Sequence, residues 1–151
     1  MAKQAQSLSF DFQKTNYKIT VMLKEKKLVL IVDDDPDYLF QLKTHVENFG
    51  FDIITANSVA EAEKALIQKP DLAILDLMME TQDAGFVLSY KIKKLYPDVP
   101  VIIVTAVTAE TGLNFHLDSE EDRQWIKADL YLEKGLRSDQ LHREISKLLK
   151  L

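Results

Sequence analysis

Residues 28–35 read Leu-Val-Leu-Ile-Val-Asp-Asp-Asp, an unbroken apolar run that ends in three consecutive acids. A short, β-branched run of this kind is typical of a strand that is buried on both faces of a parallel sheet. Apolar residues then recur at helical spacing from Tyr38 to Phe49, and Gly50 suits the end of that helix. The stretch therefore predicts a strand, an acidic loop and a helix in succession.

The same alternation of strand and helix continues to residue 150. Apolar runs predict further strands at residues 51–55, 72–75, 101–104 and 129–132. Helical spacing predicts further helices at residues 58–68, 86–96, 118–127 and 138–150, the first of them opened by a capping box of Ser58 and Glu61. Five strands that alternate with helices predict an α/β protein with a doubly wound, five-stranded parallel sheet and helices on both faces.

The N-terminal residues do not follow this pattern. We assign residues 1–26 to an N-terminal extension and residues 27–151 to the domain itself. Two segments of the extension, residues 8–12 and 17–21, alternate apolar and polar side chains on either side of a short polar stretch, which indicates a β-hairpin. A disordered tail explains the same residues equally well, because an isolated hairpin is only marginally stable in water.

The composition limits the classes of partner and cofactor. With 24 acidic and 19 basic residues the net charge is −5, which gives no basic surface for direct contact with nucleic acid and favours protein partners. The chain has no cysteine, so disulfides, thiolate metal sites and thiol nucleophiles are excluded. Its apolar runs are far shorter than the roughly 20 residues of a membrane span. We therefore expect a cytoplasmic protein without a membrane segment.

Acidic residues follow two of the predicted strands. Asp33, Asp34 and Asp35 come directly after the first strand, and Asp76 comes directly after the third. Parallel strands end at the same edge of a sheet, so these carboxylates are expected to converge and to repel one another. A divalent cation that prefers oxygen ligands, Mg²⁺ or Mn²⁺, would relieve this repulsion. The alternative for the first three acids is a simple helix cap, because acids also favour a helix start.

Two more polar residues are expected at this edge. Thr105 follows the fourth strand, and Lys134 lies two residues beyond the fifth. Taken singly, a strand threonine and a surface lysine are ordinary. Together with the carboxylates and a cation, a hydroxyl and an ammonium group can share the charge that develops on a phosphoryl group during its transfer. The combination therefore indicates phosphoryl transfer to a carboxylate.

Four segments together resemble the receiver domain of two-component response regulators. They are residues 28–35, 71–79 (Asp-Leu-Ala-Ile-Leu-Asp-Leu-Met-Met), 101–106 (Val-Ile-Ile-Val-Thr-Ala) and 131–134 (Tyr-Leu-Glu-Lys). The motifs occur in the family's order, each at the expected strand end, and the resemblance covers about residues 27–150. It implies the flavodoxin-like receiver fold and a phosphoprotein that acts as a signalling switch in a phosphorelay.

The resemblance also implies a role for the acidic residues. Asp76 resembles the phospho-acceptor. The metal ligands that it implies are Asp33, Asp34, Asp76 and the backbone carbonyl of Met78, with Asp34 the more direct ligand of the acidic pair. Mg²⁺ is the implied cofactor, and Mn²⁺ is its alternative.

Three further residues have implied roles in the switch. Thr105 is similar to the hydroxyl that moves to the phosphoryl group, Lys134 to the lysine that pairs with it, and Tyr131 to the aromatic residue that changes rotamer. The implied phosphoryl donor is a histidine kinase or a phosphotransfer protein. The implied output is contact with an unknown downstream protein, which could include a second copy of the chain. Such a domain catalyses its own Mg²⁺-dependent phosphorylation and dephosphorylation but is no enzyme with an independent substrate.

The sequence departs from the family's usual pattern at several places. Glu80 stands where the family usually has proline, Ala84 stands where it usually has glycine, and Gly85 follows one place later. Gly135 replaces the proline that usually follows the lysine, which puts the geometry around Lys134 in question. Thr105 and Lys134 lie 29 residues apart, more than is usual, so an insertion is expected at residues 108–127.

Two other functions remain open at this point. One is a docking or dimerisation module that is never phosphorylated, and the presence of every acceptor-site residue argues against it. The other is a hydrolase with an aspartyl nucleophile. It is disfavoured because no hydroxyl residue follows the first acids and the chain has no room for a lid domain.

Overall fold

The apolar runs form a single parallel sheet in the computed structural model, which describes residues 26–106 and 128–151. The strand order is β2-β1-β3-β4-β5, and every neighbouring pair is parallel. The strands are β1 (Leu28–Val32), β2 (Asp52–Ala56), β3 (Leu72–Asp76), β4 (Val101–Thr105) and β5 (Leu130–Glu133). The order reverses direction at β1, so the carboxyl ends of β1 and β3 flank the crevice where such sheets bind ligands.

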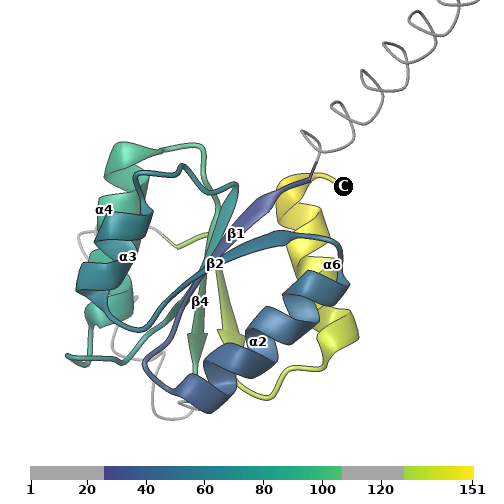
Figure 1. Cartoon of the computed structure of the whole chain (residues 1–151), viewed down its shortest axis with the longest axis horizontal. Coiled ribbons are helices and arrows are strands. Elements are labelled where there is room, and N and C mark those ends of the chain that lie inside the picture. The colour runs from purple at the N-terminus through teal and green to yellow at the C-terminus, as the bar shows by residue number, and fades with distance from the viewer. Residues whose placement is uncertain (1–25, 107–127) are drawn as a thin grey trace, which may run out of the picture.

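Helices cover both faces of the sheet. They are α2 (Pro36–Asn48), α3 (Val59–Ala65), α4 (Ala84–Leu95) and α6 (Ser138–Leu149). Figure 1 shows α3 and α4 on one side of the sheet and α2 and α6 on the other. The predicted doubly wound α/β fold is therefore confirmed. None of these described helices is long and apolar enough to span a bilayer.

Successive strand residues enter two separate cores, because side chains alternate across a sheet. Leu30 and Val32 of β1 pack in the cluster that includes Leu88 of α4, whereas Val29 and Ile31 pack in the cluster with α2 and α6. The side chains of β3 and β4 alternate in the same way and are fully buried. Burial of one such side chain contributes about 1.5–3 kcal/mol, so these central strands fix the position of their own ends.

The helix starts follow from local sequence. Asp35 is the N-cap of α2 and accepts hydrogen bonds from the backbone N–H of Asp37 (3.0 Å) and Tyr38 (3.4 Å). Ser58 caps α3 by accepting from the N–H of Glu61 at 3.1 Å. The Glu61 carboxylate accepts from the N–H of Asn57 rather than that of Ser58. One of the two hydrogen bonds of the predicted capping box is therefore formed by the preceding residue.

Element boundaries differ from the predictions by a few residues. Strand β2 begins at Asp52 instead of residue 51, because the N–H of Phe51 donates to Val46 at the end of α2. Helix α3 ends at Ala65 instead of residue 68, and tight turns follow it. The expected hairpin in residues 1–26, the insertion and the helix at 118–127 lie outside the described residues. The boundary between residues 26 and 27 stays a prediction.

Candidate functional site

Three carboxylates converge at the carboxyl edge of the sheet. Asp33 and Asp34 directly follow β1, and Asp76 is the last residue of the neighbouring strand β3. One oxygen from each carboxylate lies within 4.8 Å of the others. Asp33 is 1% exposed and Asp76 is 6% exposed, whereas Asp34 is open to solvent. The predicted convergence is therefore present, and Asp35 is separated from it by its role as the α2 cap.

Lys134 brings a positive charge to the acids. Its ammonium nitrogen lies 2.9 Å from Oδ2 of Asp33 and 3.4 Å from Oδ1 of Asp76. The backbone N–H of Lys134 donates to the carbonyl of Thr105 at 2.8 Å, which fixes the chain just after β5. Burial acts to lower the pKa of Lys134, but the two adjacent carboxylates outweigh burial and raise it. Lys134 is therefore a fixed cation even though Gly135 follows it.

The pKa of Asp76 is strongly raised. Burial is the largest cause, and the neighbouring Asp33 carboxylate is the next; together they raise the pKa of Asp76 to about 6, against the opposing effect of Lys134. One ammonium group is thus not enough to compensate for three clustered carboxylates. A divalent cation at this edge would favour the charged form of Asp76.

The residues present suit a hard divalent cation. Oδ1 of Asp33 accepts a hydrogen bond from the N–H of Asp35 at 2.9 Å. Oδ2 of Asp33 is buried and accepts no well-directed hydrogen bond among the described residues, although it has the ion pair with Lys134. A buried carboxylate oxygen without a hydrogen bond suits a metal ligand, and a donor set made only of oxygens fits Mg²⁺ or Mn²⁺. Met78 lies in the loop after β3 with a half-exposed side chain, and the use of its carbonyl as a ligand stays a prediction.

The two expected switch residues lie on adjacent strands. Thr105 ends β4 and is 2% exposed, next to the residue that pairs in register with Asp76. Tyr131 of β5 is half-buried, and its ring meets Phe86 of α4 edge-on with centroids 6.2 Å apart. Burial raises the pKa of Tyr131 to about 12, and its hydroxyl is buried without a hydrogen-bond partner in the described part of the chain.

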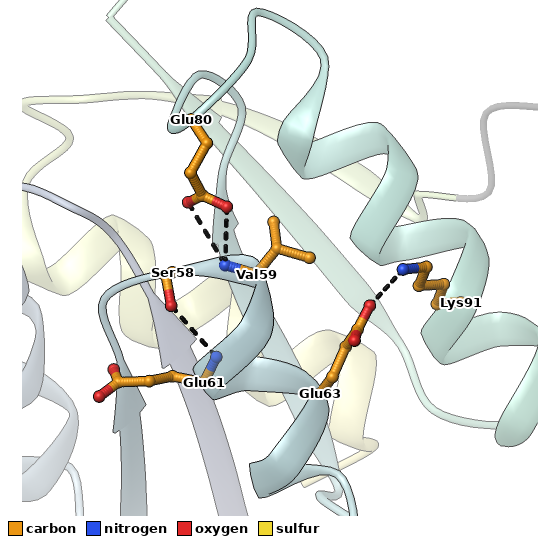
Figure 2. A network of polar contacts seen from close by, with 6 residues as sticks. All are labelled: Ser58, Val59, Glu61, Glu63, Glu80 and Lys91. Carbon is orange, nitrogen blue, oxygen red and sulfur yellow. Dashed lines mark hydrogen bonds and ion pairs between the residues drawn. The ribbon is translucent and has the colours of Figure 1, made fainter.

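Two residues at this edge were missed by the sequence reasoning. The ring of Tyr38, in the first turn of α2, lies under the Lys134 ammonium nitrogen at 4.6 Å from the ring centroid. Glu80, in the loop after Asp76, accepts a hydrogen bond from the N–H of Val59 at the start of α3 (Figure 2). An aromatic residue four places after the acidic pair was a usable signal for Tyr38. The contact of Glu80 had no such signal.

This arrangement defines a class of protein. Two acids follow β1, one ends β3, a threonine ends β4 and a lysine follows β5, on a parallel sheet of order β2-β1-β3-β4-β5. Fold and site together are those of a receiver domain. The response regulator receiver domain family matches residues 29–146, and the chain belongs to that family.

Individual relatives agree with this assignment. The chain is 33% identical to the response regulator SaeR of Staphylococcus epidermidis over 119 residues, which cover 79% of this chain and 52% of that protein. It is 43% identical to the transcriptional regulatory protein GlrR of Escherichia coli over 79 residues, or 52% of this chain and 18% of that protein. The chain thus spans about half or less of the length of these curated relatives.

Solved structures show the same likeness. The response regulator receiver domain protein of Methanospirillum hungatei superposes with a TM-score of 0.66 at 27% identity, covering 83% of this chain and 95% of that one. A response regulator from Thermotoga maritima has a TM-score of 0.67, covering 83% of this chain and 99% of that one, and its 24% identity supports the fold alone.

Proposed function

We propose that the chain is a phosphorylation-dependent signalling switch that accepts a phosphoryl group on Asp76. The observation that supports this most directly is the position of Asp76. Its carboxylate ends the central strand β3, within 4.8 Å of oxygens of Asp33 and Asp34 and 3.4 Å from the Lys134 ammonium. An acceptor needs a nucleophilic oxygen together with groups that compensate the charge of the incoming phosphoryl group, and this edge supplies both.

The reaction is an in-line transfer. A carboxylate oxygen of Asp76 forms the new P–O bond while the P–N bond to a donor histidine breaks, and its electron pair stays on the imidazole nitrogen. A bound Mg²⁺, held by Asp33, Asp34, Asp76 and the Met78 carbonyl, would neutralise charge on the phosphoryl oxygens. Lys134 exchanges its contact with Asp76 for one with a phosphoryl oxygen. The domain accelerates only its own phosphorylation and dephosphorylation.

The signal follows from the added charge. The phosphoryl group carries about −1.5 to −2 of charge in place of the single negative charge of the ionised Asp76 carboxylate, so the edge becomes more negative, and Thr105 can donate its hydroxyl hydrogen to that group. Tyr131 of β5, which pairs in register with Ile103 two residues before Thr105, then changes rotamer. Its buried hydroxyl has no hydrogen bond among the described residues, so no such bond has to break when the side chain leaves its buried rotamer. The switch shifts a two-state equilibrium that already exists.

The partners are proteins. The donor is a histidine kinase or a phosphotransfer protein in the cytoplasm, and the output is contact with a downstream protein, which could be a second copy of the chain. The net charge of −5 favours such contacts over direct binding to nucleic acid. The alternative is a receiver-like docking or dimerisation module that is never phosphorylated.

Intact mass spectrometry after incubation with Mg²⁺ and acetyl phosphate tests the proposal without the unknown kinase. Wild type and the control Asp98→Asn, which changes an exposed acid paired with Lys69, should each gain one phosphoryl group. Asp76→Asn should gain none, and excess chelator should abolish the reaction. Equal modification of Asp76→Asn would move the acceptor elsewhere. Failure of wild type both to gain a phosphoryl group and to bind Mg²⁺ would favour the docking module.

A further inference from the structure

The loop between β3 and α4 connects the acceptor to the rest of the domain. It begins directly after Asp76, and its end is anchored where the N–H of Gly85 donates to the carbonyl of Leu77 at 2.8 Å. A Cβ on Gly85 would lie only 2.5 Å from the Asp76 carbonyl oxygen, so the two ends of the loop touch backbone to backbone. Within the loop, the Thr81 hydroxyl donates to the Asp83 carboxylate at 2.7 Å. These contacts fix the loop's ends but do not attach its middle to another element.

Glu80 attaches the middle of the loop to α3 through polar contacts, in addition to the packing of Met79 against the core. Its two carboxylate oxygens lie 3.1 Å and 3.3 Å from the backbone nitrogen of Val59, the first residue of α3 and 21 positions earlier in the chain. Figure 2 shows the Glu80 side chain extending from the loop to the start of that helix. A hydrogen bond from a backbone N–H to a carboxylate is stronger than one between neutral groups. The nearby Ser58 accepts from a different N–H, that of Glu61, so the two acceptors do not compete.

The helix that receives Glu80 is itself well held. Its Ala62 is completely buried, and Leu66, just after its end, is 3% exposed in the same core. Glu63 also forms an ion pair with Lys91 of α4 (Figure 2), but both side chains are exposed, so this pair contributes little to holding the helix. Glu80 therefore links the loop to a fixed part of the domain.

We propose that Glu80 is a positioning residue for cation binding at the acceptor site. Glu80 lies two residues after Met78, whose backbone carbonyl is the expected fourth protein ligand of the cation. By holding the loop on α3, Glu80 limits the positions that this carbonyl can take before the cation arrives. The loop then loses less conformational freedom when the cation binds, and a preorganised site binds its cation more tightly. This inference rests on the proposed function, because it assumes that the acidic edge binds Mg²⁺.

Mg²⁺ affinity of three variants, measured by calorimetric titration, tests the role. Glu80→Ala removes the hydrogen bond and should raise the Kd for Mg²⁺ on the order of 3- to 10-fold, a part of what one charge-assisted hydrogen bond contributes. Glu80→Gln keeps an acceptor oxygen and should stay within about 2- to 3-fold of wild type. Glu63→Ala removes an equal charge from the same surface without touching the loop and should bind Mg²⁺ like wild type.

Amide hydrogen exchange on the metal-free protein provides a second readout. In Glu80→Ala, but not in Glu63→Ala, the amides of Val59 and of residues 77–83 should exchange faster. An unchanged Kd and unchanged exchange in Glu80→Ala would overturn the inference. Equal loss of affinity in Glu80→Gln and Glu80→Ala would also overturn it, because charge alone would then explain the effect.

The two proposals fail in different ways. If wild type binds no Mg²⁺ and gains no phosphoryl group, the proposed function fails. If wild type does both and Glu80→Ala binds Mg²⁺ equally well, only the role of Glu80 fails. Because Glu80 is exposed, both of its variants are expected to fold, and urea denaturation of each variant checks this.

Discussion

The ammonium nitrogen of Lys134 lies 4.6 Å from the centroid of the Tyr38 ring, while the same nitrogen pairs with Asp33 and Asp76. The negative face of an aromatic ring attracts a cation, and this attraction increases where water is excluded. Gly135, which has a φ of +92°, leaves the backbone after Lys134 without the rigidity of a proline. The Tyr38 ring therefore contributes to holding the lysine over the acceptor.

Replacement of Tyr38 tests this contact. Tyr38→Leu should slow phosphorylation by acetyl phosphate by about 3- to 10-fold, since it removes a cation–π contact worth about 1 kcal/mol. Tyr38→Phe keeps the ring face and should remain within about 2-fold of wild type. The measurement is the rate of adduct formation by intact mass. The matched control is Tyr90→Leu on α4, where a partly exposed tyrosine lies away from the acidic edge. A rate for Tyr38→Leu equal to that of Tyr90→Leu would contradict the prediction.

The raised pKa of Asp76 predicts how stability depends on pH in the absence of metal. The ordinary pKa is 3.8, and burial with Asp33 raises it to about 6 in the folded protein. The folded state therefore binds the proton more tightly than the unfolded state. The stabilisation by this proton is fully present below pH 3.8 and is lost as the pH rises to about 6. Ionised Asp76 thus destabilises the fold at neutral pH.

Asp76→Asn isolates this effect, because an amide of similar shape does not ionise. At pH 7.5 in chelator, Asp76→Asn should be more stable than wild type by on the order of 3 kcal/mol. Near pH 3.5 the difference should disappear, since both side chains are then neutral. Urea denaturation at each pH gives the free energies of unfolding, and added Mg²⁺ should reduce the gap at pH 7.5. A gap that is independent of pH would show that Asp76 has an ordinary pKa.

Gly85 should tolerate no side chain. Its Cβ would lie 2.5 Å from the Asp76 carbonyl oxygen and 2.7 Å from the Leu77 Cα, both of which are backbone atoms that cannot rotate away. Gly85→Ala should therefore lower the free energy of unfolding by at least about 2 kcal/mol. Gly50, which has a positive φ of 96° and open space around it, offers the contrast. Gly50→Asn should cost less than about 1 kcal/mol, because asparagine accepts left-handed backbone. Similar losses for both variants in urea denaturation would refute the steric explanation.

The strands and the convergence of the acidic residues could be predicted because they follow from local sequence patterns and from the geometry of a parallel sheet. The apolar runs located all five strands, and the geometry of parallel strands brought Asp33, Asp34 and Asp76 together. Helix α3 ends at Ala65, three residues before the predicted end, and the apolar Ile67 beyond that end is 88% exposed. An apolar residue just beyond a helix gives the same periodic signal as one within it.

The parts that were missed depend on contacts between loops and distant elements. Glu80 meets Val59 only because the β3–α4 loop folds back to α3, and no local pattern specifies that path. The placement of Gly85 one residue later than the family's usual glycine follows from its close approach to Asp76, which is visible only in three dimensions. The geometry around Lys134, which the sequence left in question because Gly135 replaces a proline, also depends on distant contacts. The backbone hydrogen bond to Thr105 and the ion pair with Asp33 hold this lysine in place.

Two serine-to-alanine substitutions should change stability in opposite directions. Ser89 of α4 is 0% exposed, and its hydroxyl has no hydrogen-bond partner in the described residues. A buried, unpaired hydroxyl is unfavourable, and alanine is the better helix former, so Ser89→Ala should raise the free energy of unfolding by about 1 kcal/mol. Ser58→Ala removes the cap on the N–H of Glu61 and should lower it by about 1 kcal/mol. Urea denaturation of both variants measures these changes. Destabilisation by Ser89→Ala would mean that its hydroxyl is paired in solution, by a water or by a residue outside those described.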